Sequence, residues 1–404
     1  METHRNCRPR RHCPPECTGD SMSRHFDEDE FVRKRNLALK VAIGLIVLIC
    51  IGALIYCLSN GLDQKQTSLA PAEKYHTHSP DCFEAPSVPG DRRKDKRFLK
   101  VANFNAEWLF LYGGRGGIRC PADSCPWTNM ATAMFHLSQV ANMLANIDAD
   151  VVHLSEVEDC RVLKTLLEAI PGDHGYAPYL INGKDHMTGQ NVALLTRIDP
   201  KADLVRTEKR GHYPIPGSRC PSHRSGTVGI TKHYVAAMDI ENDRGDVTPF
   251  LFVGLHLLAR PADKFRCAQR EGQAAVLSDL THSLSTKDER IIMMGDYNDY
   301  DEDAIGVDGR KPLTEVLKRL YKSSGSNRLL LNAARLVPTQ ERYSCWFDMN
   351  QNCRVDGNRE RVMIDHILYD SALKVVEAKI HHDYVPSCDQ RVSDHWPFSV
   401  TFRL

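Results

Sequence analysis

The residues best suited to chemistry lie in segment 291–300, IIMMGDYNDY. An apolar run that predicts a buried strand ends at Gly295, and Asp296 and Asn298 then follow two positions apart. Side chains two positions apart in an extended chain share a face, so this carboxylate and amide would project together. The pair could hold a hard cation or a phosphate oxygen. Because Gly-Asp after an apolar run is also common in plain turns, a functional site here requires partners from other segments.

Polar residues also follow other apolar runs, where α/β proteins often carry functional groups. Asn103, Asn105 and Glu107 alternate in ANFNAEW and would share one face of a strand. Arg266 and Arg270, one helical turn apart, either contact phosphate or pair with nearby acids. Further candidates at the ends of expected strands are Glu156, Gln190, Asn191, His256, Asp365, His366, Asp394 and His395. Taken singly, each is also explained by a helix cap, a strand cap or a solvated edge.

Two Asp-His pairs near the C-terminus suggest a carboxylate that orients an imidazole. They are Asp365-His366 in MIDHI and Asp394-His395 in SDHWP. Because Asp394 and His395 are adjacent, their side chains would point in different directions on a strand. We therefore expect Asp365, from a neighbouring strand, to be the partner of His395.

The apolar patterns beyond residue 98 predict both strands and helices. Strands are expected at 98–104, 150–154, 191–196, 233–240, 249–255, 290–294, 362–369, 373–381 and 396–402. Helices are expected at 130–146, 161–170, 261–284 and near 312–321. Several consecutive strands lack an intervening helix, which favours a layered α/β protein with mixed sheets over a doubly wound parallel one.

Segment 41–58, VAIGLIVLICIGALIYCL, carries no charge and is long enough to cross most of a bilayer. We interpret it as a transmembrane helix, since it starts too far into the chain for a usual signal peptide and lacks a clear cleavage site. A buried core helix is the other alternative. Basic residues crowd its N-terminal side, which predicts a type II single-pass topology with the N-terminus cytosolic and the remainder extracellular or lumenal.

Composition divides the 404-residue chain into four expected parts. They are a disordered cytosolic tail at 1–36, the transmembrane signal-anchor at 37–59, a linker or stalk at 60–97 and one globular domain at 98–404. The formal net charge is zero and hydrophobic residues make up 42%, which fits a real core. This neutrality gives no argument for bulk nucleic-acid binding through charge.

Cysteines beyond the expected span number nine of the 14, an odd count that predicts a free or intermolecular thiol. In an oxidising compartment the others would pair, and short spacing suggests Cys120 with Cys125 and Cys345 with Cys353.

The motif series NFNAEW, HLSE, NVALLTR, GLH, GDYND, IDHI and SDHWP resembles the endonuclease/exonuclease/phosphatase superfamily, of which deoxyribonuclease I is a member. The resemblance extends from about residue 98 to the C-terminus. It implies a four-layer α/β sandwich, in which two facing mixed β-sheets are flanked by helices, here preceded by the transmembrane helix. GDxN followed by a terminal SDHxP, with Asn and Glu upstream, is the specific part of this signature.

The resemblance also implies roles for individual residues. Asn105, Glu156 and Asp394 would form the metal site, with Glu156 as the principal carboxylate ligand of Mg²⁺. Of the implied catalytic residues, Asp296 and Asn298 would orient the attacking water and hold the phosphate, and His256 would serve as general acid. His395, oriented by Asp365, would contact the scissile phosphate or act as general base. Deoxyribonuclease I has a glutamate supporting the second histidine near where this chain has Gln190, so the protonation of His256 is open.

These roles suit phosphodiester hydrolysis, which needs a nucleophilic water, charge neutralisation and protonation of the leaving oxygen. Oxygen ligands favour Mg²⁺, with Mn²⁺ as the alternative, and the site lacks the cysteines that would indicate zinc. We expect a membrane-anchored Mg²⁺-dependent phosphodiesterase, foremost a nuclease. A sphingomyelinase-like lipid phosphodiesterase and a non-catalytic binding module are the alternatives, because the sequence does not select DNA, RNA or lipid as the partner.

Overall fold

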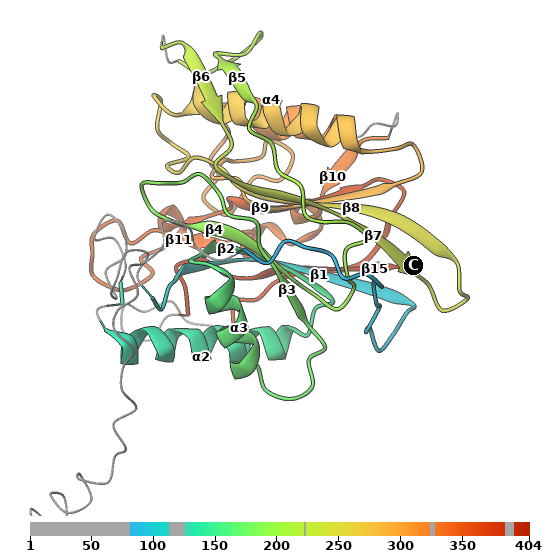
Figure 1. The fold of residues 1–404 in the computed structure, drawn as a ribbon. Coiled ribbons are helices and arrows are strands. Elements are labelled where there is room, and N and C mark those ends of the chain that lie inside the picture. Colours follow the sequence, from blue (N-terminus) through green and yellow to red (C-terminus); the bar gives the residue numbers. More distant parts are fainter. Residues whose placement is uncertain (1–80, 113–125, 128, 222–223, 324–327, 384–391) are drawn as a thin grey trace, which may run out of the picture. The chain divides into compact units, whose positions relative to one another are not determined.

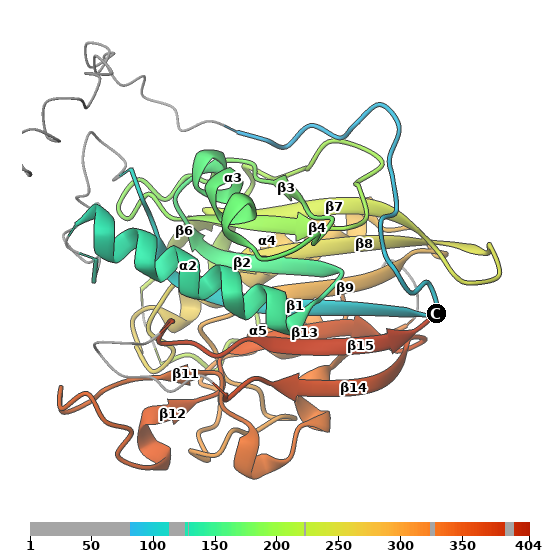
Figure 2. The ribbon, with the colours of Figure 1, turned by 90° about the horizontal axis from the view of Figure 1, so that it is seen from below.

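Two mixed β-sheets face each other, and helices cover their outer faces (Figures 1 and 2). The computed structural model describes residues 81–112, 126–127, 129–221, 224–323, 328–383 and 392–404. The first sheet has the strand order β14 (Lys374–Ile380), β15 (Phe398–Arg403), β1 (Phe98–Leu109), β2 (Val151–Val157), β4 (Asn191–Thr196) and β3 (Ala177–Tyr179). The second has the order β10 (Leu330–Asn332), β13 (Asp365–Asp370), β9 (Arg290–Asp296), β8 (Val247–His256) and β7 (Lys232–Glu241).

One parallel pair lies inside each sheet, β1 with β2 and β8 with β9, while the other neighbours are antiparallel. The mixed α/β architecture expected from the sequence is therefore confirmed. Two small hairpin-like pairs accompany the sheets: β5 (Arg210–Tyr213) with β6 (Gly226–Gly229), and β11 (Cys345–Trp346) with β12 (Arg361–Val362). The sequence patterns did not indicate these short strands, nor β3 and β10.

Helices α2 (Met130–Ile147) and α3 (Cys160–Ala169) lie on the six-stranded sheet, and α4 (Cys267–Leu284) lies on the five-stranded sheet (Figure 1). A capping box formed by Asn129 and Thr132 begins α2, and the Asp159 carboxylate caps α3. Because Asp159 supplies the cap, Glu156 is left for another role. The short helices are α5 (Val316–Leu320), η2 (Ala333–Leu336), η3 (Thr339–Glu341) and η4 (Asn358–Glu360).

Three apolar layers hold these elements together. The first lies between the sheets and includes Val101, Phe252 and Phe398. The second lies beneath α2 and α3, and the third lies between the five-stranded sheet and α4. Burial of apolar surface on both faces of each sheet explains why β4 and β13 are buried along their whole lengths.

Some expected boundaries are wrong. Helix α4 begins at Cys267 instead of 261, because residues 261–266 form turns closed by bonds from the amides of Arg266 and Cys267 to the carbonyl of Asp263. The helix expected near 312–321 is limited to α5. Strand β1 continues to Leu109, five residues beyond its expected end, through an irregular pairing with β2.

Residues 81–97, placed in the linker by the sequence, contact the domain. Cys82 forms a disulfide with Cys160, and the Arg92 guanidinium donates to both carboxylate oxygens of Asp199 at 2.7 Å. The Arg93 side chain is buried and pairs with Asp91. The domain therefore begins at or before residue 81, within the compact unit Tyr75–Leu404.

The cysteine pairing differs from the local expectation. Cys220 pairs with Cys267, and Cys345 is a buried free thiol, so the expected Cys345–Cys353 bond is wrong. Cys353 is disulfide-bonded, and Cys120 and Cys125 lie outside the described residues.

None of the helices in the described part of the chain combines the length and the apolar character needed to cross a membrane. The segment interpreted as a span, 41–58, lies outside that part.

Candidate active site

Strand pairing brings the predicted catalytic residues of three strands together. Asp296, the last residue of β9, lies opposite His256 on β8 and opposite Asp365 on β13. On the facing sheet, β1 and β2 run parallel and carry Asn105 and Glu156 towards their carboxyl ends. Neighbouring strand ends of this kind are where α/β folds usually place ligand-binding groups.

Asn105 joins the two sheets at this point. Its amide nitrogen lies 3.2 Å from Oε1 of Glu156, 3.1 Å from Oδ2 of Asp296 and 3.5 Å from Nε2 of His395. Its amide oxygen accepts from the backbone N–H of Glu107 at 3.1 Å, which fixes the orientation of the amide. One buried side chain thus contacts an expected metal ligand and two expected catalytic residues.

His395 is held by Asp365, as the sequence predicted. Its Nδ1 lies 2.6 Å from Oδ2 of Asp365, and its Nε2 points towards Asp296, 3.9 Å from Oδ2. The Asp365 carboxylate also accepts from the Ser344 hydroxyl at 2.8 Å and from the Asn103 amide at 3.2 Å. These bonds fix the carboxylate and, through it, the plane of the imidazole.

The sequence reasoning missed two serines that support this arrangement. The Ser393 hydroxyl donates to the carbonyl of Asn105 at 2.7 Å and accepts from the backbone N–H of His395 at 3.0 Å. Ser344 accepts from the backbone N–H of Asp365 at 3.0 Å. Ser393 belongs to the motif SDHWP, so its position was a usable signal, whereas nothing in the sequence pattern marked Ser344.

The backbone is irregular at the site. Glu107, Trp108, Glu156 and Asn298 all have positive φ angles, between 43° and 63°. Pairing of β2 shifts register between Ser155 and Val157, so Glu156 leaves the regular ladder. Its Oε2 accepts from the backbone N–H of Trp108 at 3.1 Å. Left-handed residues other than glycine are uncommon and concentrate at functional sites.

The carboxylates of Glu156 and Asp394 form the oxygen-rich side of the site. Burial raises the pKa of Glu156, and the nearby Asp394 carboxylate raises it further. The Asp394 side chain is 36% exposed, and its backbone N–H donates to Oε2 of Glu107 at 2.9 Å. The two carboxylates repel each other and lie beside solvent. A hard divalent cation fits such a pair of oxygen donors, because it offsets their negative charge and keeps water molecules as its other ligands. The expected carboxylate ligands Glu156 and Asp394 therefore suit such an ion. Asn105 instead turns its amide nitrogen towards Glu156 and its amide oxygen towards the Glu107 backbone, so its role as a ligand stays a prediction.

Asp296 and His395 differ sharply in proton affinity. Burial and then the neighbouring Asp365 carboxylate raise the pKa of Asp296, His395 opposes them, and the result is a pKa of about 7. Burial would lower the pKa of His395, but the Asp365 carboxylate and then the Asp394 carboxylate outweigh it, so this pKa lies well above its usual range. His395 is therefore an imidazolium at neutral pH.

His256 has a different environment from the one its expected role requires. Its Nε2 lies 3.6 Å from Oδ2 of Asp296, and its Nδ1 has no hydrogen-bond partner among the described residues. Burial, followed by Lys232 and His395, lowers the pKa of His256 well below its usual value. No described carboxylate supports Nδ1, and Gln190 instead accepts from Nζ of Lys232 at 3.1 Å. The general-acid role of His256 stays a prediction.

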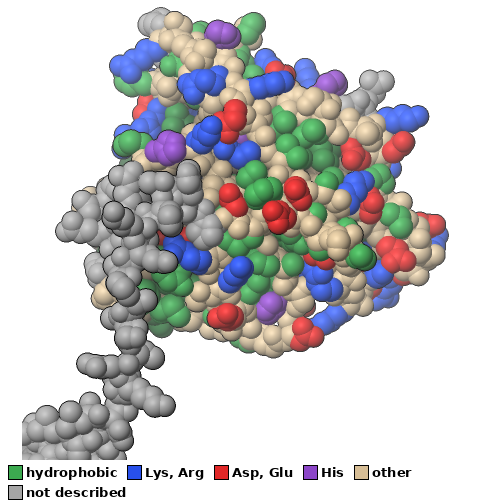
Figure 3. Space-filling model, in the orientation of Figure 1, with side chains coloured by type: hydrophobic (Ala, Val, Ile, Leu, Met, Phe, Trp, Pro, Cys, Tyr) green, Lys and Arg blue, Asp and Glu red, His purple; other side chains and the backbone are tan. Residues whose placement is uncertain are grey.

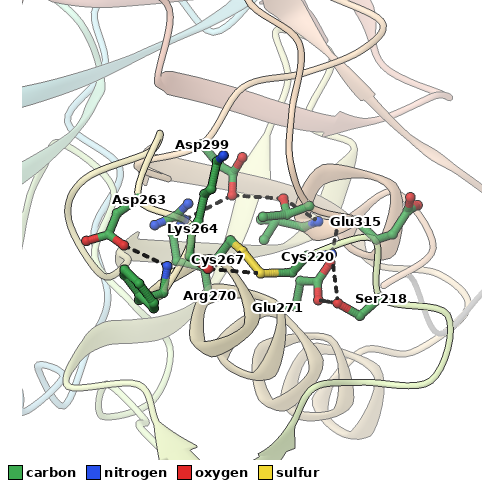
Figure 4. Close-up of a disulfide and its surroundings, with 12 residues drawn as sticks. Ser218, Cys220, Asp263, Lys264, Cys267, Arg270, Glu271, Asp299 and Glu315 are labelled. Atoms are coloured by element: carbon green, nitrogen blue, oxygen red, sulfur yellow. Dashed lines mark hydrogen bonds and ion pairs between the residues drawn. A yellow bond between two sulfur atoms is a disulfide. The ribbon is translucent and has the colours of Figure 1, made fainter. Parts of the chain in front are cut away.

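The turn after Asp296 is anchored from behind. The backbone N–H of Asn298 donates to Oδ1 of Asp296 at 2.8 Å. Next in the chain, the buried Asp299 carboxylate accepts from Nε of Arg270 at 3.0 Å and from the Thr314 hydroxyl at 2.8 Å. Figure 4 shows Arg270 reaching from α4 towards Asp299, close to the Cys220–Cys267 disulfide. Arg270 thus pairs with an acid and is fully buried, which rules out the phosphate contact.

Comparison with known proteins defines the class. The endonuclease/exonuclease/phosphatase family model matches residues 128–395. The chain belongs to this family and is one of its metal-dependent phosphodiester hydrolases, with a buried Asp/His cluster at the candidate site. No curated protein matches the sequence.

Several solved structures resemble the chain. Truncated TDP2 from Caenorhabditis elegans is 16% identical, with 76% of this chain and 98% of that one covered and a TM-score of 0.43. TDP2 from D. rerio, solved with a single-strand DNA product, is 16% identical over 76% and 99%, with a TM-score of 0.45. A Beutenbergia cavernae member of the family is 15% identical over 76% and 72%, with a TM-score of 0.48.

Proposed function

We propose that this hydrolase is a Mg²⁺-dependent nuclease. The observation that carries the proposal is the contact of the Asn105 amide with Glu156, Asp296 and His395, which joins a carboxylate metal site to an imidazole. Hydrolysis of a phosphodiester requires these two functions within the length of one phosphate group. Mg²⁺ is the preferred ion because the donors are oxygens, and Mn²⁺ is the alternative.

The residues divide the chemistry between them. Asp296, whose pKa is raised to about 7, accepts a proton from the attacking water, and the Asn298 amide holds a phosphate oxygen. His395 donates a charge-assisted hydrogen bond from Nε2 to the phosphate, since its Nδ1 is held by Asp365. When bound, a divalent cation would be held by the Glu156 and Asp394 carboxylates and would neutralise charge on the nonbridging oxygens.

We further propose that one helix anchors the protein to a membrane. The support is the uncharged run 41–58 with basic residues on its N-terminal side, which places the N-terminus in the cytosol and the hydrolase domain outside it or in a lumen. The disulfides Cys82–Cys160 and Cys220–Cys267 suit such an oxidising compartment. Residues 60–80 would then serve as the stalk.

The charge on the face shown in Figure 3, like the net charge, does not select the substrate. Figure 3 shows basic, acidic and hydrophobic side chains interspersed on the face presented there, without a continuous basic field. With a formal net charge of zero, nucleic acid would be held by local contacts near the active site. A lipid phosphodiester held close to the membrane is the alternative substrate.

A substrate panel tests the proposal. The full-length protein is incubated with plasmid DNA, RNA, sphingomyelin vesicles and phosphoinositide vesicles, each with Mg²⁺ or with EDTA. We expect cleavage of nucleic acid that EDTA abolishes and that is lost in His395→Ala and Asp296→Ala, while both variants keep the native circular dichroism spectrum. Mg²⁺-dependent turnover of lipid alone would replace the nuclease with a lipid phosphodiesterase, and unchanged turnover in either variant would contradict the residue roles.

A further inference from the structure

A free thiol lies beside the catalytic imidazole. Cys345, in the short strand β11, is buried and forms no disulfide. It is paired across an antiparallel bridge with His395. Backbone bonds on either side fix this pairing: Trp346 N–H to the carbonyl of Asp394 at 2.8 Å, and Trp396 N–H to the carbonyl of Ser344 at 2.7 Å. The thiol therefore has a defined position relative to His395.

Three different ligand types meet at this point. One ligand atom each from Cys345, Asp394 and His395 lie within 4.8 Å of one another. Nδ1 of His395 is occupied by Asp365 at 2.6 Å, which leaves Nε2 for a ligand, and Nε2 lies 3.9 Å from Oδ1 of Asp394. The partly exposed Asp394 side chain provides access from solvent. Sulfur, nitrogen and oxygen donors thus surround one small space.

This donor set differs in kind from the Mg²⁺ site. Mg²⁺ prefers oxygen ligands in octahedral geometry, whereas thiolate with imidazole favours Zn²⁺ and similar softer ions in tetrahedral geometry. Three protein ligands plus one water would complete a tetrahedron. The Asp365 carboxylate behind Nδ1 of His395 is the outer partner that metal-binding histidines usually have.

We propose that Cys345, Asp394 and His395 form an inhibitory site for Zn²⁺ or a related soft divalent ion, overlapping the catalytic site. The inhibitory part rests on the proposed function. On binding, metal–sulfur and metal–nitrogen bonds form, the thiol S–H bond of Cys345 and the Nε2–H bond of the His395 imidazolium break, and both protons pass to solvent, with no change in oxidation state. Because the ion takes Nε2 of His395 and an oxygen of Asp394, neither group can then serve phosphodiester hydrolysis.

Binding is tested without any substrate. The full-length protein is titrated with Co²⁺, whose bond to a thiolate gives a sulfur-to-metal charge-transfer absorption in the near ultraviolet. The measured quantity is the wild-type spectrum minus that of Cys345→Ser, because Cys7, Cys13 and Cys17 also offer thiols. We expect a difference band that saturates at one Co²⁺ per chain and that Zn²⁺ displaces. His282→Ala, which removes an exposed histidine, should keep the band, and absence of a difference band would overturn the site.

Inhibition is tested separately. Zn²⁺ is added to the Mg²⁺-dependent reaction, and each rate is divided by the same variant's rate without Zn²⁺. We expect Cys345→Ser to need about tenfold or more Zn²⁺ than wild type for half-inhibition. Equal sensitivity would mean that Zn²⁺ acts elsewhere and would overturn the inhibitory role. A cobalt difference band without hydrolysis of any substrate would establish the metal site while overturning both the proposed function and the inhibition.

Discussion

The orientation of His395 depends on one carboxylate that belongs to a different strand. Asp365 touches Nδ1 of the imidazole and is itself held by the Ser344 hydroxyl and the Asn103 amide. The negative charge of Asp365 is also the largest of the interactions that raise the pKa of His395. Removing this charge while keeping the shape therefore separates the electrostatic contribution of Asp365 from its packing.

For Asp365→Asn we expect the turnover number to fall by about 10- to 100-fold, as for other groups that orient a functional histidine. The amide no longer stabilises the imidazolium, so His395 holds the phosphate more weakly at neutral pH. Steady-state cleavage assays at several pH values measure this. Asp370→Asn, at the other end of β13, is the matched control, because Asp370 pairs with Arg328 instead of the site. Equal losses of activity in both variants would contradict the specific role of Asp365.

For individual residues, the sequence predicts a contact at the site only where simple strand geometry determines it. Adjacent residues on a strand point apart, which was enough to predict that Asp365 partners His395. Ser344 and Lys232 reach the site through folding of distant segments, and no local pattern marks them. Cys345 was assigned to a disulfide from short spacing alone, because sequence does not reveal the strand register that buries its thiol beside His395.

Strand β9 must run very close to β8 to deliver Asp296. A Cβ added at Gly295 would lie 2.0 Å from the carbonyl oxygen of Leu255, a backbone atom that cannot rotate away. The same pair of strands carries His256 opposite Asp296, one residue further on. The glycine that ends the apolar run is therefore required by the spacing between these strands.

Gly295→Ala should separate β9 from β8 and displace Asp296. We expect a loss of about 1–3 kcal/mol in the free energy of unfolding, as for other overpacked core positions, together with reduced turnover. Urea denaturation and the cleavage assay measure the two effects. Gly229→Ala is the control, since a Cβ there has no neighbour closer than 3.6 Å, and it should change neither quantity appreciably. A stable, fully active Gly295→Ala variant would show that the strands adjust freely.

Element types were easier to predict than element ends. The helical apolar period of α2 and the continuous apolar run of β8 were found because burial on one face of a helix, or on both faces of a strand, requires those patterns. The end of β1 was missed because the left-handed residues Glu107 and Trp108 and the register shift against β2 interrupt the strand before Leu109, and the sequence reveals neither feature. Very short strands such as β11 depend on distant partners and have no pattern of their own.

At the scale of the whole molecule, residues 81–97 belong to the hydrolase domain, which the sequence patterns started at residue 98. The disulfide from Cys82 to Cys160 links residues 78 positions apart and ties this segment to α3. Closing so long a loop restricts the unfolded chain and so favours the folded state. The charged run 91–97 suggested a solvated tether, but Arg92 forms an ion pair with Asp199 and the buried Arg93 guanidinium donates to the carbonyl of Phe98 at 2.9 Å. A chain cut at residue 98 would lose these contacts, which is why the proposed assays use the full-length protein.

Buried neutral histidines give the molecule a defined response to acid. Burial lowers the pKa of His153 to about 3, and burial with Arg206 lowers that of His233 to about 4, against an ordinary value of 6.5. Between about pH 4 and 6.5 the unfolded chain therefore binds more protons than the folded one. Their contribution to stability is complete above pH 6.5 and is lost as the pH falls.

His233→Gln tests this linkage at one position. Nε2 of His233 accepts from the backbone N–H of Thr207 at 2.9 Å, and a glutamine amide oxygen can replace it without titrating. When the pH falls from 7 to 5, a buried histidine of this kind lowers the free energy of unfolding by about 2 kcal/mol. The decrease in the free energy of unfolding should therefore be about 2 kcal/mol smaller for His233→Gln than for wild type. Urea denaturation at the two pH values measures the difference, with His282→Gln as the exposed control. If His233→Gln and wild type lose the same stability, the folded protein must protonate His233 without cost, and its burial would not be the source of the acid sensitivity.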